Sequence, residues 1–149
     1  MSDPQTAPDL QVFVYGTLKP GQKYWQQICE GRVHTAMPAR VRGQLVALDL
    51  GYPALLDPLA VPSPSEPGWV HGYILTLPDP EILREIDALE DFDPFRPPQA
   101  NDYNRAAILC YDPTGQPFTQ AWTYFMHPER AQTYGARPLA KGTWNGSTW

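Results

Sequence analysis

A short segment near the start of the chain, residues 12–22, constrains the fold more than any other part of the sequence. Its first three residues, 12–14, are apolar without interruption, which predicts a strand that is covered on both faces. Gly16, Pro20 and Gly21 then end the strand and permit backbone shapes that other residues resist. The segment therefore predicts a buried strand that runs into a tight loop, and such a loop can present bare N–H groups to an anion.

Length and composition indicate one compact domain over residues 1–149, with its core at about 11–127 and a tail at 128–149. The net charge is -5 and the eleven Lys and Arg residues are scattered, which argues against nucleic acid as a partner. No apolar run approaches the roughly 18 residues that span a bilayer, and residues 1–11 are polar. We expect a soluble, cytoplasmic protein that does not bind membranes.

Cysteine and proline add two further expectations. Cys29 and Cys110 lack CxxC spacing, so we expect neither a disulfide nor a structural zinc site, and both thiols should be buried. The eighteen prolines gather in residues 53–67, 78–80 and 94–98, which marks these segments as connections because proline removes a ladder donor and breaks helices. Residues 57–68 are expected to form a surface loop.

Hydrophobic periodicity predicts an α+β domain with a strongly curved or barrel-like sheet. The sequence favours a short helix at residues 22–29 and a well-defined one at 79–91, capped by Asp79. No clear periodicity is seen in the tail. The expected strands, about six in number, are residues 12–15, 32–36, 39–50 (long or bent at Gly43), 69–77, 103–111 and 118–126, the last two paired antiparallel.

One acid lies on the apolar side of the 79–91 helix. At about 100° per residue, Glu90 falls only about 50° from the centre of the apolar stripe, whereas Asp87 and the other acids fall at its edge or in solvent. A carboxyl that faces the interior must be paired, hydrogen-bonded or neutral, and burial raises its pKa towards the working pH. Glu90 is therefore a candidate general acid/base; the alternative is that it pairs with Arg105 or frays into solvent.

The loop at residues 16–22 has a near match that we exclude. Gly16 and Gly21 have the spacing of a nucleotide-binding P-loop, but Gln22 and Lys23 stand where Lys and then Ser or Thr are required. The sequence thus argues against nucleotide hydrolysis, and a plain strand-to-helix connection remains the alternative to an anion cradle.

Other chemistry finds less support in the sequence. His34, His71 and His127 are isolated and make no metal-binding pattern, and we expect His34 and His71 to be partly buried in strands. Tyr103 and Arg105 alternate onto one face of their strand and could line a cleft with Glu90, unless Arg105 is simply exposed at a sheet edge.

Residues 12–22 resemble the signature of the gamma-glutamylcyclotransferase-like family, particularly the branch that includes gamma-glutamylamine cyclotransferases. The similarity rests on a hydrophobic strand that ends in Tyr15-Gly16-Thr17-Leu18-Lys19-x-Gly21-Gln22. It continues in Ile86-Asp87-Ala88-Leu89-Glu90, which is similar to the family's catalytic-acid helix, and in the Tyr103-x-Arg105 pair. The resemblance implies a small mixed β-barrel with flanking helices.

The resemblance also implies a reaction. Tyr15, Gly16, Thr17 and Leu18 would hold the glutamyl end of a small-molecule substrate, with backbone N–H groups on its α-carboxylate, and Tyr103 and Arg105 would complete the cleft. Glu90 would take a proton from the substrate's α-amino group as this attacks the γ-carbonyl, releasing 5-oxoproline and a free amine. Because the nucleophile belongs to the substrate, neither a cofactor nor a metal is needed.

Two departures bear on the substrate rather than on the fold. The chain has Lys23-Tyr24-Trp25 where the branch often has Asn-His, and Asp91 where Gly often follows the acid. The sequence therefore favours a cyclotransferase for a gamma-glutamyl amine or peptide, acting as a monomer. The alternatives are gamma-glutamyl deprotection of a biosynthetic intermediate and a non-catalytic small-metabolite binding module.

Overall fold

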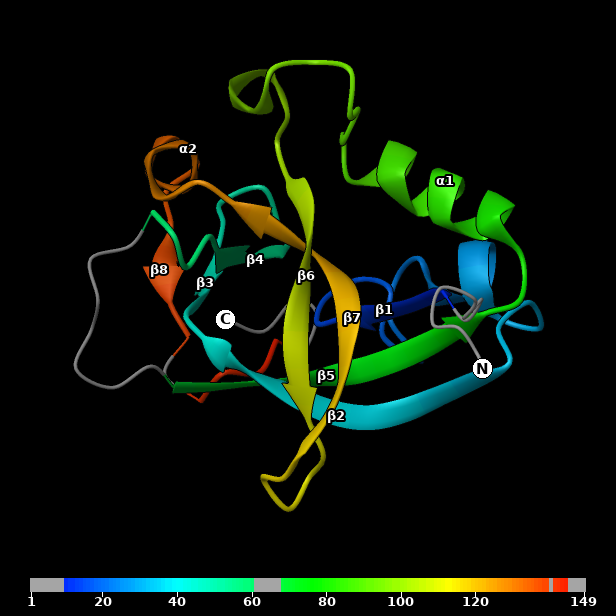
Figure 1. Cartoon of the computed structure of the whole chain (residues 1–149). Coiled ribbons are helices and arrows are strands. Elements are labelled where there is room, and N and C mark those ends of the chain that lie inside the picture. Colours follow the sequence, from blue (N-terminus) through cyan, green and yellow to red (C-terminus); the bar gives the residue numbers. More distant parts are fainter. Residues whose placement is uncertain (1–9, 61–67, 140, 145–149) are drawn as a thin grey trace.

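The computed structural model describes residues 10–60, 68–139 and 141–144, and its centre is a closed, mixed β-barrel of five strands (Figure 1). The barrel contains β1, β5, β2, β6 and β7, and β4, β3 and β8 continue the sheet from β7. The strand bounds are β1 Leu10–Val14, β2 Thr35–Gly43, β3 Leu45–Ala47, β4 Pro53–Leu56, β5 Gly68–Leu77, β6 Asn104–Tyr111, β7 Pro117–Met126 and β8 Arg137–Pro138. The helices are α1 Pro80–Leu89 and α2 Pro128–Thr133, with single turns at η2 Trp25–Cys29 and η3 Pro98–Ala100.

A parallel contact closes the barrel. β1 pairs antiparallel with β5 along its whole length, and on its other side it meets β7 in parallel, with Val12 opposite Trp122. β6 and β7 form the antiparallel hairpin that the sequence predicts, and β2 contacts β6 where Arg40 faces Tyr111. The prediction of an α+β fold with a small mixed β-barrel and flanking helices is confirmed.

The core has two parts, and β1 contributes to both. Val12 and Val14 belong to a cluster that includes the apolar face of α1, while Phe13 points to the other side and packs among strand residues such as Ile74 and Phe125. This division confirms the prediction that the opening strand is covered on both faces. It also holds the end of β1, where the loop begins, in a fixed place.

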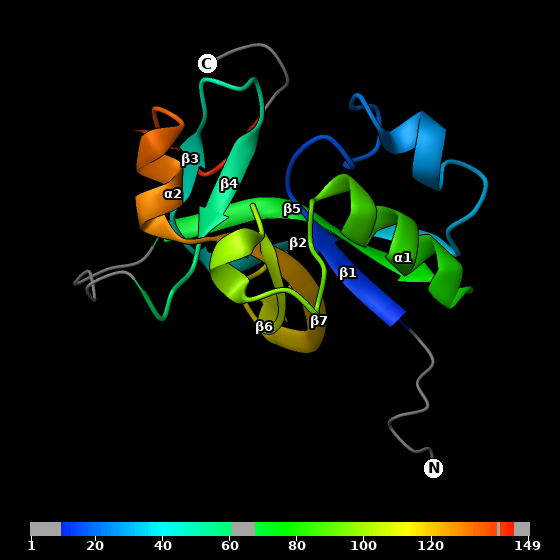
Figure 2. The same ribbon diagram turned by 90° about the horizontal axis from the view of Figure 1, so that it is seen from above.

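Helix α1 agrees closely with its prediction. The Asp79 side chain caps it by accepting from the Glu81 N–H at 2.9 Å, and Ile82 and Ile86 are buried beneath it. Seen from above, α1 lies on one side of the end of β1, and β3, β4 and α2 lie on the other (Figure 2). The chain thus surrounds the end of β1 with elements from distant parts of the sequence.

Several element predictions were wrong. β2 continues through Pro38 instead of breaking there. One edge of β2 pairs with β5 along its length, but the other edge pairs with β6 only at Arg40, so the missing N–H of Pro38 costs no hydrogen bond on that side. The break comes instead at Gln44, between β2 and β3. The expected helix at 22–29 is only one wide turn, in which the Glu30 N–H donates to the Trp25 carbonyl at 2.9 Å.

Prolines and the tail account for the remaining differences. β4 begins at Pro53, which the sequence marked as a connection, and the tail contains α2 and β8. Of the expected surface loop at 57–68, residues 61–67 lie outside the described residues, and Gly68 already belongs to β5. α2 is too short to show a period; the His127 side chain caps it by accepting from the Glu129 N–H at 3.1 Å.

Burial of the singled-out side chains follows the predictions only in part. Cys29 and Cys110 are buried free thiols, as expected. His34 and His71 are exposed, contrary to expectation, because His34 precedes β2 and His71 lies on the outer face of β5. Within the ranges that the structure covers, no helix is long and apolar enough to cross a membrane.

Candidate active site

A pocket opens where β1 ends, between the C-terminal end of α1 and the start of β4. It encloses about 370 Å³ of empty space including its open mouth. Its walls come from the β1 strand and loop, the β3–β4 connection, the end of α1 and the strands β6 and β7. The lining residues are Phe13, Val14, Tyr15, Gly16, Thr17, Leu18, Tyr52, Pro53, Glu90, Tyr103 and Tyr124.

Tyr15 fixes the start of the loop through its side chain. Its buried hydroxyl donates to the Tyr124 carbonyl at 2.6 Å and accepts from the Leu55 N–H at 3.1 Å, so it ties β1 to β7 and β4. Burial raises the pKa of this phenol, and nearby Glu90 raises it further. Since both hydrogen bonds are internal, Tyr15 shapes the pocket while its hydroxyl stays engaged with the protein.

The loop itself presents unused donors. The N–H of Lys19 donates to the Gly16 carbonyl at 3.0 Å, and that of Tyr24 donates to the Thr17 carbonyl at 2.8 Å, which folds residues 16–24 into tight turns. Within the described part of the chain, the N–H groups of Gly16, Thr17 and Leu18 donate to no backbone carbonyl. Successive free N–H groups in a turn form a concave site for an anion.

A larger residue at position 16 would clash with the opposite wall of the pocket. A Cβ atom at this position would lie 2.9 Å from Cγ of Pro53, in the opposite wall of the pocket. Glycine is required at position 16 because the loop and β4 approach each other closely. The backbone conformation does not add to this requirement, since the φ of Gly16 is not in the left-handed region.

Glu90 is the first residue after α1, and its backbone N–H still donates to the Ile86 carbonyl at 2.9 Å. The residue keeps some exposed surface, but burial of its carboxyl raises the pKa to about 8, and the charge of Asp87 adds to the rise. Among the described residues the carboxyl forms no ion pair. The alternative in which Glu90 pairs with Arg105 is therefore wrong, and the carboxyl is free to meet a ligand.

Arg105 lies outside the pocket lining and binds Asp87 instead. Its Nη1 donates to Oδ1 of Asp87 at 2.9 Å and to Oδ2 at 2.7 Å, and the Tyr124 hydroxyl donates to Oδ1 at 2.6 Å. Only 16% of the Asp87 side chain is exposed, so of the predicted edge and solvent positions it has the edge one. The helical pattern of α1 gave no signal for this pair, because the partners of Asp87 come from β6 and β7.

Tyr103 and Tyr52 form the wall opposite the loop. The buried Tyr103 hydroxyl donates to the Pro53 carbonyl at 2.7 Å, and burial raises its pKa well above the ordinary value. Tyr52, whose ring centroid lies 6.4 Å from that of Tyr103, has a hydroxyl with no hydrogen-bond partner among residues 10–60, 68–139 and 141–144. Sequence reasoning missed Tyr52 because it lies between the predicted strand at 39–50 and the proline-marked segment at 53–67, where no pattern singles it out.

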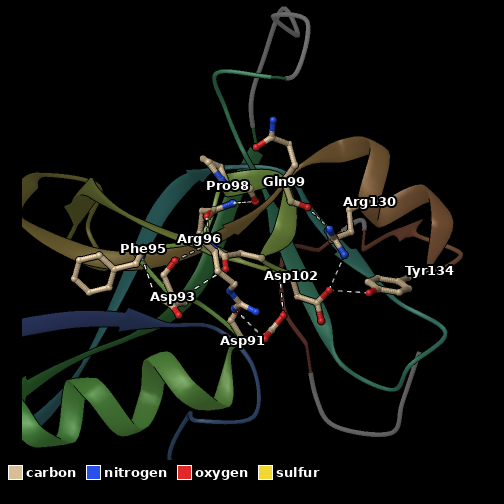
Figure 3. Close-up of polar contacts among 11 residues, drawn as sticks. Asp91, Asp93, Phe95, Arg96, Pro98, Gln99, Asp102, Arg130 and Tyr134 are labelled. Carbon is tan, nitrogen blue, oxygen red and sulfur yellow. Dashed lines mark hydrogen bonds and ion pairs between the residues drawn. The ribbon is translucent and has the colours of Figure 1, made fainter.

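Hydrogen bonds order the loop that follows Glu90 (Figure 3). Asp91 adopts a φ of 58°, a left-handed conformation that Asp tolerates better than most residues, at the position where the resemblance leads one to expect Gly. Nη2 of Arg96 donates to the Asp91 carbonyl at 2.9 Å, and the Asp102 N–H donates to Oδ2 of Asp91 at 3.2 Å. Asp102 in turn accepts from Arg130 at 2.9 Å, which links the loop to α2.

The described residues contain no group of three or more His, Cys, Asp or Glu side chains that could hold a metal ion. Six of the predicted site residues meet at one pocket: Tyr15, Gly16, Thr17, Leu18, Glu90 and Tyr103. Arg105 does not reach it.

The structure thus combines a closed mixed barrel with a pocket in which the loop after the first strand and the Glu90 carboxyl lie together. The chain belongs to the AIG2-like gamma-glutamyl cyclotransferase family, whose family model matches residues 12–146. No curated protein sequence matched the chain.

Solved structures share the fold. An AIG2-like protein from Mus musculus is 23% identical with a TM-score of 0.56, and the match covers 92% of this chain and 88% of that one. YkqA from Bacillus subtilis is 20% identical with a TM-score of 0.61, covering 91% of this chain. The match spans only 39% of the length of YkqA. Allophanate hydrolase from Kluyveromyces lactis is 14% identical with a TM-score of 0.58. That match covers 94% of this chain but only 21% of the hydrolase.

Proposed function

We propose that this protein releases 5-oxoproline and a free amine from a gamma-glutamyl amine or peptide. One observation carries the proposal: the unused N–H groups of residues 16–18 and the unpaired carboxyl of Glu90 line the same small pocket. An anion cradle beside a proton-transfer group suits a zwitterionic glutamyl head, which has a carboxylate and an amine on one carbon. Membership of the cyclotransferase family supports the same reaction class.

The proposed reaction begins with binding. The substrate α-carboxylate accepts hydrogen bonds from the N–H groups of Gly16, Thr17 and Leu18, which places the α-amino group near Glu90. The pocket is small, so the glutamyl chain folds back on itself and brings its amine close to its own γ-carbonyl. Holding two reacting groups of one molecule in this geometry supplies several kcal/mol of the barrier.

Proton transfer accompanies formation of the new C–N bond. The α-ammonium group of the zwitterion first loses one proton to solvent. The neutral nitrogen then attacks the γ-carbonyl carbon, and the Glu90 carboxylate accepts the second proton that this nitrogen loses as the bond forms. In this proposal the hydroxyl of Tyr52, which lines the pocket, donates to the carbonyl oxygen as negative charge develops there. When the original C–N bond breaks, Glu90 returns the proton to the departing nitrogen, and the products are 5-oxoproline and the free amine.

The raised pKa of Glu90 supports both halves of this role. A carboxyl with a pKa of about 8 is a stronger base than an exposed one and still gives its proton back near neutral pH. An ordinary glutamate would hold the proton too weakly to accept it from an amine.

The test is a substrate panel with 5-oxoproline release as the readout. We expect release from gamma-glutamyl amines or peptides, and none from the matched α-glutamyl isomers or from N-acetylated gamma-glutamyl amines, in which the nucleophile is blocked. If the gamma-glutamyl compounds bind but none releases 5-oxoproline, the enzyme assignment is wrong and a binding module is favoured. If release from a biosynthetic intermediate far exceeds that from simple amines and peptides, the reaction is a deprotection.

A further inference from the structure

A second cluster of polar groups lies just beyond the active-site loop, around the side chain of Lys19. Only 7% of Lys19 is exposed, and its Nζ donates to the Trp144 carbonyl at 2.7 Å. Among the residues with defined positions, no carboxylate pairs with this ammonium, and burial lowers its pKa. A buried ammonium with three donors and one carbonyl acceptor is costly, and it indicates that an acceptor of opposite charge is missing.

Two further cationic or basic side chains come from neighbouring strands. Arg40 on β2 lies opposite His71 on β5 in the antiparallel register, so both side chains project from the same, outer face of the barrel. The Arg40 guanidinium lies 4.2 Å from the centroid of the Trp69 ring, yet its buried Nε has no hydrogen-bond acceptor in the described part of the chain. Burial lowers the pKa of His71, and the charges of Arg40 and Lys19 lower it further.

These three side chains line one surface pocket, separate from the active site, with about 900 Å³ of empty space including its open mouth. The backbone of β2 and β5 forms its floor, and Thr143 and Pro113 form parts of its walls. Among the residues that the structure describes, no acidic residue lines this pocket, although the whole chain carries a net charge of -5. The cationic side chains of Lys19 and Arg40 line the same pocket, so an anion bound there would be attracted by both.

We propose that this outer pocket, defined by Lys19, Arg40 and His71, binds a phosphate group, either inorganic phosphate or one carried by a small metabolite. Arginine and lysine are the side chains that recognise phosphate oxygens in proteins, and a group of about two negative charges matches the Lys19 ammonium and the Arg40 guanidinium, neither of which pairs with a carboxylate of the described residues. Lys19 follows Leu18 directly, so a bound phosphate also steadies the loop that lines the active-site pocket. Phosphate binding does not depend on the proposed cyclotransferase reaction. Only the coupling between the bound phosphate and the active-site loop rests on that proposed function.

The experiment measures inorganic phosphate binding by calorimetry and by the rise in melting temperature, with ionic strength kept constant with sodium chloride. We expect saturable binding to the wild-type protein and an affinity about tenfold weaker or more in Arg40→Gln, because a hydrogen bond to a charged group is lost. Arg84→Gln removes the same charge from the exposed face of α1, where Arg84 pairs with Glu81, and should bind phosphate as the wild type does.

Three results would overturn the proposal: no saturable binding beyond the effect of ionic strength, equal loss in Arg40→Gln and Arg84→Gln, or unchanged binding in Arg40→Gln. The last would place the phosphate elsewhere, including the loop of the active-site pocket. His71→Asn provides the decision if Arg40→Gln does not fold, since His71 is exposed on β5 and its loss should also weaken phosphate binding. Circular dichroism establishes folding for each variant.

Discussion

Asp87 lies one helical turn before Glu90, and its charge bears on the proton affinity of that buried carboxyl. Burial is the larger cause of the raised pKa of Glu90, and the Asp87 carboxylate adds to it. Arg105 and Tyr124 hold that carboxylate in place with three short hydrogen bonds. Arg105 therefore contacts Asp87 and not the pocket, and we propose that it positions Asp87, whereas the resemblance assigned it to the substrate.

Asp87→Asn is expected to lower the pKa of Glu90, because a negative charge is removed and Arg105 is left without its partner. The acid limb of the pH profile of kcat should move to lower pH by about one unit. Glu81→Gln, on the exposed face of the same helix, is the matched control and should leave the limb in place. An acid limb that stays put or moves to higher pH in Asp87→Asn would refute this electrostatic coupling.

Tyr52→Phe tests the one pocket tyrosine whose hydroxyl has no partner among the described residues. If this hydroxyl donates to the developing oxyanion, kcat falls by roughly 10²-fold while KM changes little. Removal of a hydroxyl that only lines the pocket would instead leave kcat nearly unchanged. The control is Tyr111→Phe on β6, outside the pocket, which should retain activity.

At this scale the sequence predicted some roles and missed others for physical reasons. Glu90 could be found because helical geometry places a lone acid on an apolar stripe. The role of Asp87 could not be predicted, because the apolar pattern of α1 does not show which residues of other elements contact the helix. Arg105 on β6 and Tyr124 on β7 bind Asp87. Tyr52 had no local pattern at all.

Among the elements, β1 and its loop matched their prediction most closely, because an uninterrupted apolar run and bounding glycines leave few alternatives. The strands that begin at or cross proline were missed. Pro38 and Pro53 sit where a missing N–H costs no ladder bond, and only the pairing of distant strands reveals such places. The short α2 and β8 depend in the same way on contacts with the rest of the sheet.

Gly72 tests how closely β1 and β5 approach each other. A Cβ atom at this position would overlap the Val14 carbonyl oxygen and lie 2.8 Å from the Phe13 ring. Gly72→Ala is therefore expected to lower the free energy of unfolding by at least about 3 kcal/mol, measured by denaturant titration. Gly68→Ala on the same strand, where the nearest neighbour would be 3.8 Å away, should cost less than about 1 kcal/mol. Equal costs in the two variants would contradict the packing described for β5.

For the whole molecule, closure of the barrel brings the pocket together. The loop, β4, α1 and β6 are far apart in the sequence, and they meet because β1 pairs with β5 on one side and with β7 on the other. Sequence patterns predicted the presence of a curved sheet but not the order of its strands, since periodicity carries no information about which strands pair. The site is consequently a property of the folded chain and not of any one segment.

The buried carboxyl of Glu90 also affects stability across the pH range. Its pKa in the folded protein is about 8, above the ordinary value of 4.5, so the protonated form favours folding below pH 4.5 and this contribution is lost as pH rises through 8. Glu90→Gln has no carboxyl at this position, so its stability does not fall in this way as pH rises. The variant should therefore gain stability relative to the wild type between about pH 5 and 8, reaching a few kcal/mol, as measured by urea unfolding at several pH values. A constant difference across that range would show that the carboxyl titrates normally.

The most direct test of the account compares 5-oxoproline release by wild type, Glu90→Gln and Glu81→Gln, with substrate binding measured by calorimetry in the same samples. The account predicts that Glu90→Gln binds a gamma-glutamyl amine with nearly the wild-type affinity but releases 5-oxoproline at least about 10²-fold more slowly, while Glu81→Gln behaves as the wild type. Release at the wild-type rate by a folded Glu90→Gln would contradict the claim that Glu90 carries the proton.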